Sequence, residues 1–292
     1  MKILDMHIHS TAAAPDPAGM LRQMEQAGVW GGAVFSPPPD ACGYEERMQL
    51  LARWSEGRED RIFPVLWIHP YEPDAIAKAR DAASRGVAAF KMICDSYYVY
   101  ERESMALVET IAQLEKPILF HSGILWEDGP SSRYNRPLNW EALIAVPGLK
   151  FSMGHCSWPW YDECIALYGK FLNAYSRNPD GASEMFFDLT PGTPAIYRED
   201  LLYKLFHVTY DVPHNILFGT DSTANCYKPD WVSRWIRTDN ALYDKIGVPE
   251  KIRQLIYRDN FLRFVGRLPK DFVHRTPVPD DAETWSLESF RG

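Results

Sequence analysis

The sequence predicts an α/β protein whose parallel strands close into a (β/α)8 TIM barrel. Short apolar runs alternate with amphipathic stretches along the chain, the runs number eight, and the stretches between them are long enough for crossover helices. An open doubly wound sheet is the competing architecture. No glycine-rich phosphate fingerprint follows the first run, which favours the barrel.

Each strand is predicted from an apolar or β-branched run bounded by Gly, Pro or polar residues. The predicted strands span residues 3–8, 31–36, 62–68, 87–93, 117–121, 149–153, 184–189 and 215–219. The amphipathic stretches between them span residues 17–28, 44–57, 72–85, 101–115, 138–146, 159–176 and 194–207. These stretches have the length that a crossover between parallel strands requires.

Two further helices are predicted after the eighth strand, over residues 230–244 and 249–265. The second opens at Pro249-Glu250, where proline suits the first helical turn. We therefore expect a single barrel domain over residues 1–268 and a C-terminal tail over 269–292. The sequence leaves open whether this tail wraps the barrel, packs on a neighbouring subunit or stays loose.

Composition narrows the class of partner. The 292 residues carry a formal net charge of −8, which disfavours nucleic acid and anionic membranes because those surfaces select a basic face. We therefore expect a small-molecule substrate, and a homo-oligomer stays open. The five cysteines show no CxxC spacing, and no run resembles a signal peptide or approaches the roughly 18 apolar residues of a membrane span. A cytoplasmic protein is expected.

Metal-capable side chains stand at the ends of four predicted strands. His7 and His9 end the first strand, His121 ends the fifth, His155 follows the sixth and Asp221 follows the eighth. In this fold the carboxyl ends of the strands form the active-site face, so these groups are expected to converge. A pair of histidines two residues apart is weak evidence alone, since each can be a capped or solvated residue. The combination of four strand ends favours a metal site.

Imidazole and carboxylate ligands without a thiolate suit a catalytic Zn²⁺, Mn²⁺ or Fe²⁺ better than a structural zinc. We expect Zn²⁺ as the identity of the ion. Cys156, next to His155, is interpreted as a small buried filler rather than a ligand.

The chain resembles the amidohydrolase superfamily, in the branch that includes aminocarboxymuconate-semialdehyde decarboxylase and resorcylate decarboxylase. The resemblance rests on Asp5-x-His7-x-His9, His121-Ser122-Gly123, Arg136-Pro137, Gly154-His155-Cys156-Ser157-Trp158-Pro159-Trp160 with Glu163, and Gly219-Thr220-Asp221. These residues are spread over the barrel but not over the tail. They are specific for the superfamily and say little about the substrate.

The resemblance implies that His7, His9, His121 and Asp221 hold one divalent ion, with His155 beside it as a proton donor or further ligand. Asp221 and His155 are then the expected catalytic residues, Asp221 as the base for a metal-activated water. Asp5 is expected on the same strand face as the two histidines, because alternate residues share a face. It is either an outer carboxylate that orients a ligand or a buried, hydrogen-bonded group of the barrel.

Lys91, near the end of the fourth predicted strand, is a candidate for contact with the metal or the substrate. Binuclear members of the superfamily use a carboxylated lysine from this strand as a bridging ligand. The branch that this chain most resembles often carries a lysine here while binding a single metal. We therefore favour an amine that pairs with Asp221 or holds a substrate carboxylate.

Substrate-binding residues are expected around the same mouth. Arg136 lies in a loop after the fifth strand whose length is typical of functional loops. With Trp158 it can line an aromatic, cationic wall for an anionic or ring-shaped substrate, or it can simply anchor the loop. His69, which ends the third strand, is expected in the pocket wall or in a local hydrogen bond.

Three functions are compatible with these residues. The leading hypothesis is a metal-dependent hydrolase that opens a small lactone, amide or ester, carboxylated or ring-shaped, with a metal-activated water. The alternative is a metal-dependent, non-oxidative decarboxylase or hydratase of an aromatic or muconate-like acid. The third is a barrel that binds a ligand without catalysis.

Overall fold

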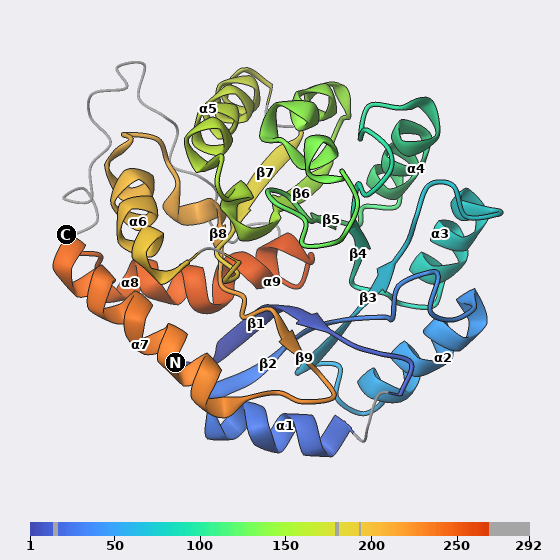
Figure 1. The fold of residues 1–292 in the computed structure, drawn as a ribbon, viewed down its shortest axis with the longest axis horizontal. Coiled ribbons are helices and arrows are strands. Elements are labelled where there is room, and N and C mark those ends of the chain that lie inside the picture. Colours follow the sequence, from blue (N-terminus) through green and yellow to red (C-terminus); the bar gives the residue numbers. More distant parts are fainter. Residues whose placement is uncertain (14–16, 179–180, 193, 269–292) are drawn as a thin grey trace.

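The computed structural model describes residues 1–13, 17–178, 181–192 and 194–268. The predicted tail, 269–292, lies outside the described residues. Eight strands follow one another around the sheet, and each pairs in parallel with the next. They are β1 (Ile3–His9), β2 (Val29–Phe35), β3 (Ile62–Trp67), β4 (Ala89–Met92), β5 (Ile118–Phe120), β6 (Lys150–Met153), β7 (Glu184–Asp188) and β8 (Ile216–Leu217) (Figure 1).

The sheet closes on itself between its first and last strands. The Met6 amide donates to the carbonyl oxygen of Phe218, just beyond β8, at 3.0 Å. A short strand, β9 (Ser222–Thr223), then pairs in parallel with the end of β1. The predicted TIM barrel is therefore confirmed.

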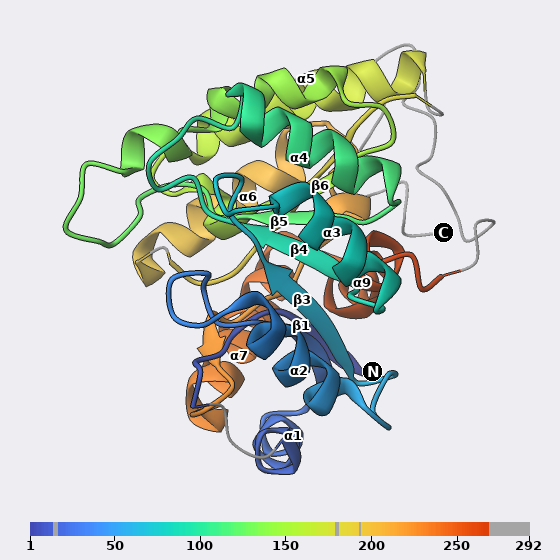
Figure 2. The same ribbon diagram turned by 90° about the vertical axis from the view of Figure 1, so that its right-hand side faces the viewer.

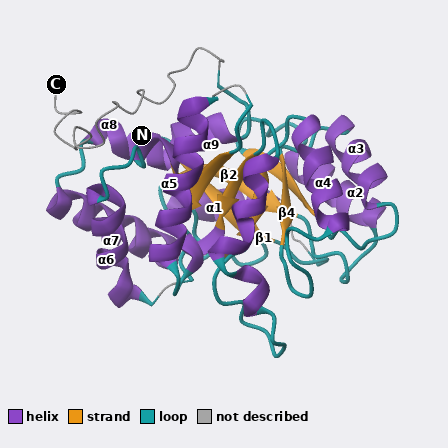
Figure 3. Cartoon of the chain, turned by 90° about the horizontal axis from the view of Figure 1, so that it is seen from above, coloured by secondary structure: helices purple, strands orange, loops and turns teal. Residues whose placement is uncertain are grey.

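The helices lie outside the strands, as Figures 2 and 3 show. They are α1 (Pro17–Gln26), α2 (Tyr44–Ser55), α3 (Ala75–Ser84), α4 (Arg102–Gln113), α5 (Tyr161–Arg177), α6 (Arg198–His207), α7 (Pro229–Ile246), α8 (Glu250–Gln254) and α9 (Asn260–Phe264). The short 3-10 helices are η1 (Ser132–Asn135), η2 (Pro137–Ala145), η3 (Gly154–Ser157), η4 (Ala195–Tyr197) and η5 (Pro213–Asn215).

Two predicted helices differ in kind from the expectation. The stretch 138–146 is the 3-10 helix η2, and the stretch 249–265 is divided by a π-helical turn, η6 (Leu255–Asp259), between α8 and α9. The second segment closes the amino end of the barrel. Phe261 packs edge-on against Phe63 and Phe264 against Phe186, both with ring centroids 4.9 Å apart.

The side chains of β1 do not alternate strictly between the two faces of the strand. Leu4 and Met6 belong to the cluster inside the barrel, whereas Ile8 packs in the cluster between sheet and helices. The register against β2 shifts between Asp5 and Ile8, and such an irregularity reverses the facing of the residues beyond it. The prediction that Asp5 shares a face with His7 and His9 is therefore wrong.

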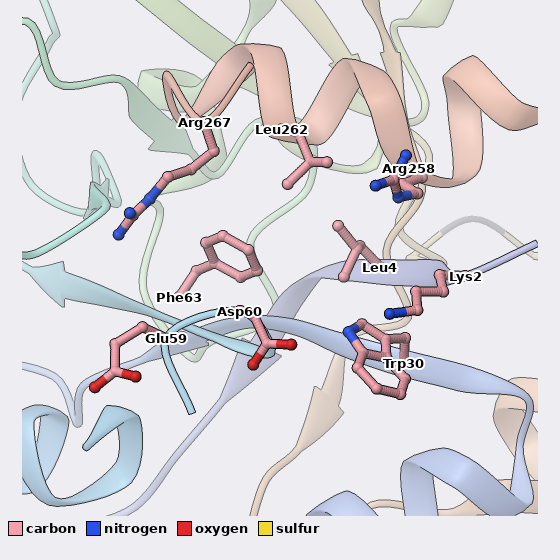
Figure 4. A pocket seen from close by; sticks show the side chains of 9 residues that line it. All are labelled: Lys2, Leu4, Trp30, Glu59, Asp60, Phe63, Arg258, Leu262 and Arg267. Atoms are coloured by element: carbon pink, nitrogen blue, oxygen red, sulfur yellow. The ribbon is translucent and has the colours of Figure 1, made fainter. Parts of the chain in front are cut away.

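A cavity of about 430 Å³ lies at the amino ends of the strands. Figure 4 shows Arg258 and Leu262 of the C-terminal helical segment facing Leu4 and Phe63 on the strands. Its described lining contains neither histidine nor cysteine. Because active sites of this fold lie at the opposite end, this cavity does not belong to the predicted site. Within the described part of the chain, no helix has the length and apolar character needed to cross a bilayer.

Candidate metal centre

Three predicted ligands meet where the carboxyl end of β1 adjoins the loop after β8. The His7 and His9 Nε2 atoms lie 3.2 Å apart. The Asp221 Oδ1 atom lies 3.3 Å from His9 Nε2 and 3.7 Å from His7 Nε2. Three potential donor atoms thus surround one point, which is the arrangement that a divalent ion requires.

His155 and His121 stand beside this group. The His155 ring centroid is 5.4 Å from that of His7 and 5.0 Å from that of His121. One donor atom each from His7, His155 and Asp221 lie within 4.8 Å of one another. The His121 Nε2 atom instead lies 3.2 Å from the carbonyl oxygen of Ile124. Its part as a metal ligand stays a prediction.

The backbone is left-handed at two of these strand ends. Asp221 has φ of 57°, and His155, Cys156 and Ser157 have φ of 56°, 45° and 61°. Non-glycine residues rarely adopt this conformation, which is often found where a side chain must be aimed into a site. The Ser122 hydroxyl supports the turn, because it lies 2.8 Å from the Ser157 hydroxyl and donates to the Gly154 carbonyl oxygen at 2.7 Å.

Asp188, which ends β7, is a site residue that the sequence analysis missed. Its Oδ2 atom lies 2.7 Å from His7 Nδ1, and its Oδ1 atom accepts the Thr190 amide at 2.8 Å. A carboxylate at Nδ1 keeps the proton on that nitrogen and leaves the Nε2 lone pair free for a metal. The signal was present, since Asp188 follows the apolar run Met185-Phe186-Phe187 as the other ligands follow theirs.

Burial favours the neutral form of three histidines of the site. Burial lowers the pKa of His7, His121 and His155 below the ordinary value. Burial alone would raise the pKa of Asp221. The hydrogen bond from His9 nevertheless lowers it well below its usual range, together with the positive charge that His7 and His155 carry when they are protonated. Neutral imidazoles beside an ionised carboxylate are the protonation states in which these groups bind a cation.

Lys91 reaches the same cavity from β4. It is fully buried, and its Nζ atom finds no hydrogen-bond partner among the described residues. Burial lowers the pKa of this amine to about 8, although the negative charges of Asp188 and Asp221 act to raise it. A buried cation without a hydrogen-bond partner is costly, and the Lys91 Nζ atom also lies 5.2 Å from the centroid of the Phe35 ring.

Asp5 has a structural role. Its carboxylate accepts the amides of His7 and Thr220 at 3.1 and 3.0 Å and the Tyr227 hydroxyl at 3.0 Å. Burial raises its pKa to about 7. Asp5 therefore ties β1 to the residue that precedes Asp221, and it is the buried, hydrogen-bonded group that was the second alternative.

The donor groups open into a cavity of about 190 Å³. Its described lining consists of His9, Lys91, Ile93, His121, Ile124, Leu125, Trp126, His155, Trp158, Gly192 and Asp221. Trp126 and Trp158 stack with ring centroids 6.2 Å apart and planes inclined by 13°. The lining therefore combines aromatic and apolar side chains with the Lys91 amine and with metal-capable groups.

Two predicted substrate ligands lie outside this lining. The Arg136 Nε atom lies 3.0 Å from Glu163, whose other oxygen accepts the Leu138 amide, so Arg136 anchors its loop to α5. His69 Nε2 lies 3.4 Å from Asp95. Arg136 thus anchors its loop and His69 makes a local contact, and these are the alternative roles that the sequence left open for them. Cys156 is fully buried, and its thiol donates to the Asp188 carbonyl oxygen, as a small filler would.

Gly219→Ala is expected to destabilise the protein by about 1–3 kcal/mol through overpacking. A Cβ atom at Gly219 would overlap the Thr190 hydroxyl and come within 2.9 Å of His7 Cβ. Gly19→Ala is the control, because the nearest atom there is 3.8 Å away in a helix and alanine should stabilise by about 0.5–1 kcal/mol. Urea denaturation measures both, and a neutral Gly219→Ala would contradict the close packing.

Comparison with known proteins identifies the family. The model of the family described as Amidohydrolase matches residues 3–267. No curated protein matches the sequence.

Solved structures share the fold at low sequence identity. An uncharacterised TIM-barrel protein from Bordetella bronchiseptica aligns with a TM-score of 0.66 and 16% identity, over 91% of this chain and 99% of that chain. A 2,6-dihydroxybenzoate decarboxylase from Rhizobium aligns with a TM-score of 0.60 and 14% identity, over 91% of this chain and 99% of that chain. A probable 2-pyrone-4,6-dicarboxylic acid hydrolase from Acinetobacter baumannii aligns with a TM-score of 0.58 and 11% identity, over 91% of this chain and 100% of that chain.

Proposed function

Since this chain belongs to the amidohydrolase family, we propose that it is a metal-dependent hydrolase of a small carbonyl substrate, a lactone, amide or ester. The observation that carries the proposal is the convergence of His7 Nε2, His9 Nε2 and Asp221 Oδ1 within 3.7 Å. His121, which lines the same cavity, is proposed as the fourth protein ligand beside these three. His155, which has a donor atom within 4.8 Å of His7 and Asp221, is proposed as a proton donor or a further ligand.

The donor set fits one divalent ion, with Zn²⁺ preferred over Mn²⁺ or Fe²⁺ because it combines imidazoles with a carboxylate. When bound, such an ion polarises a carbonyl oxygen and lowers the pKa of a coordinated water to about 7. The protein must supply the remaining functions, which are proton transfer and substrate orientation.

Asp221 is the base in this proposal. Its carboxylate lies 3.3 Å from His9 in the lining of the cavity, where it is placed to accept a proton from an attacking water. The His155 Nδ1 atom lies 3.3 Å from the Thr190 carbonyl oxygen, which places the proton on Nδ1 and a lone pair on Nε2. Neutral His155 therefore accepts a hydrogen bond or binds the ion, and it becomes a proton donor only after it has taken up a proton.

The cavity defines the substrate in outline. At about 190 Å³ it admits a small molecule, and Trp126 and Trp158 offer a flat apolar wall. The Lys91 amine, which finds no hydrogen-bond partner among the described residues, can bind a carboxylate of the substrate. We infer a small, planar, anionic substrate.

The same lining supports a second candidate function, the metal-dependent decarboxylation or hydration of an aromatic or muconate-like acid. Lys91 favours it, because a buried amine can hold the carboxylate of such an acid beside the metal centre. The solved 2,6-dihydroxybenzoate decarboxylase is 14% identical to this chain, and at that identity the likeness shows a shared fold and not a shared activity.

Metal analysis and product analysis together test the proposal. We expect one equivalent of divalent metal per chain, loss of turnover with a chelator, and incorporation of one ¹⁸O atom from labelled water when a lactone is opened. Release of CO₂ from a hydroxybenzoate-type acid, with a solvent deuteron at the vacated carbon and no ¹⁸O, would instead establish decarboxylation. Protein without stoichiometric metal and indifferent to chelators would support a barrel that only binds its ligand.

A further inference from the structure

We propose that the buried ion pair of Arg198 and Asp239 positions the metal centre, by fixing the segment 188–190 that places the ring protons of His7 and His155. The inference rests on the proposed metal centre and assigns it two positioning residues that lie outside the cavity. Neither residue is among the described groups that line the pocket.

The segment 188–190 contacts both imidazoles. Asp188 Oδ2 lies 2.7 Å from His7 Nδ1, and the Thr190 carbonyl oxygen lies 3.3 Å from His155 Nδ1. Each acceptor holds a proton on Nδ1 and so leaves Nε2 of the same ring unprotonated. The orientation of two candidate ligands therefore depends on the position of three consecutive residues.

This segment is itself fixed from the side away from the cavity. Arg198, at the start of α6, donates from one terminal nitrogen to the Leu189 carbonyl oxygen at 2.7 Å. Its other two nitrogens bind both carboxylate oxygens of Asp239 on α7 at 2.8 and 2.7 Å. The Leu189 amide donates to the Leu217 carbonyl oxygen at 2.9 Å, so both sides of Leu189 are anchored.

The arginine is suited to this role by its shape. Arg198 and Asp239 are 2% and 0% exposed, and the loss of hydration offsets most of the attraction in such a buried pair. The rigid guanidinium fork, however, binds a carboxylate and a carbonyl in fixed directions at once, which a lysine cannot do. The pair therefore contributes more to the geometry of the 188–190 segment than to the stability of the fold.

Arg198→Lys tests the inference because it keeps a cation beside Asp239 but loses the fork. Ring ¹⁵N spectra of the metal-free protein report which nitrogen of each histidine is protonated. We expect His7 and His155 to change from the single Nδ1-protonated form to a mixture. The Kd for Co²⁺, measured by titration of its visible spectrum, should rise about tenfold, the lower end of the range for groups that orient metal ligands.

Arg47→Lys is a matched control. Arg47 is also buried, binds both oxygens of Glu72 and donates to the carbonyl of Trp67 at the end of β3, at 2.5 Å. We expect both Arg47→Lys and Arg198→Lys to lower the melting temperature. Arg47→Lys should leave the His7 and His155 ring signals unchanged.

Two outcomes would overturn the inference: wild-type ring spectra and Co²⁺ affinity in folded Arg198→Lys, or the same spectral change in Arg47→Lys. If Arg198→Lys does not fold, Asp239→Asn provides the second variant, since it keeps the shape of the pair and weakens its hold on Arg198. The ring spectra need no metal, so a wild-type protein that fails to bind Co²⁺ would refute the proposed function while leaving this test intact.

Discussion

Asp221→Asn is expected to lower kcat by about 10²–10⁴-fold, the usual contribution of a general base. Asparagine has nearly the same shape as aspartate and tolerates left-handed backbone, so the φ of 57° at this position should be preserved. The loss would then report the missing negative charge beside His7 and His9 rather than a change in the loop. Steady-state kinetics with circular dichroism and a melting curve separate the two effects.

His7→Ala is expected to abolish turnover for a different reason, since it removes one of the three converging donor atoms. Asp95→Asn is the control for both variants. Asp95 is a carboxylate that contacts His69 outside the cavity lining, and its loss should change kcat less than about twofold, as exposed pairs contribute little. Wild-type turnover in either Asp221→Asn or His7→Ala would refute the assignment of the centre.

The strands could be predicted because buried parallel strands form short apolar runs between polar segments. The boundary of β2 shows where this reasoning fails. The prediction began at residue 31, but the strand begins at Val29, because Gly31 and Gly32 lie inside it. A Cβ atom at Gly31 would overlap the Arg61 carbonyl oxygen, so these glycines mark a close approach of neighbouring strands rather than a turn.

The site was predictable to the extent that its residues occupy strand ends. His155 and Asp221 were found because each follows an apolar run, and Asp188 could have been found by the same rule. The orientation of Asp5 could not, because the irregularity in β1 leaves no trace in the alternation of residue types. The pairing of Arg198 with Asp239 joins two helices and has no local signal in the sequence.

Asp188→Asn is expected to raise the Kd for Zn²⁺ about 10–100-fold, the usual effect of removing a group that orients a histidine ligand. The carboxylate at 2.7 Å can only accept, so it fixes the His7 proton on Nδ1. An asparagine can turn its NH₂ group toward that nitrogen, which would move the proton to Nε2, the atom that faces His9 and Asp221. Competition with a chromophoric chelator measures the affinity.

Asp211→Asn separates this effect from the general cost of disturbing a buried aspartate–histidine pair. Asp211 lies 2.7 Å from Nδ1 of His214, and both residues are buried, but they precede β8 and thus lie at the opposite end of the barrel from Asp221. Both variants should lose stability to a similar degree, whereas only Asp188→Asn should lose zinc. Equal zinc affinity in the two folded variants would contradict this prediction. The Asp188 carboxylate would then support only the barrel wall, and the bound ion itself would determine which nitrogen of His7 carries the proton.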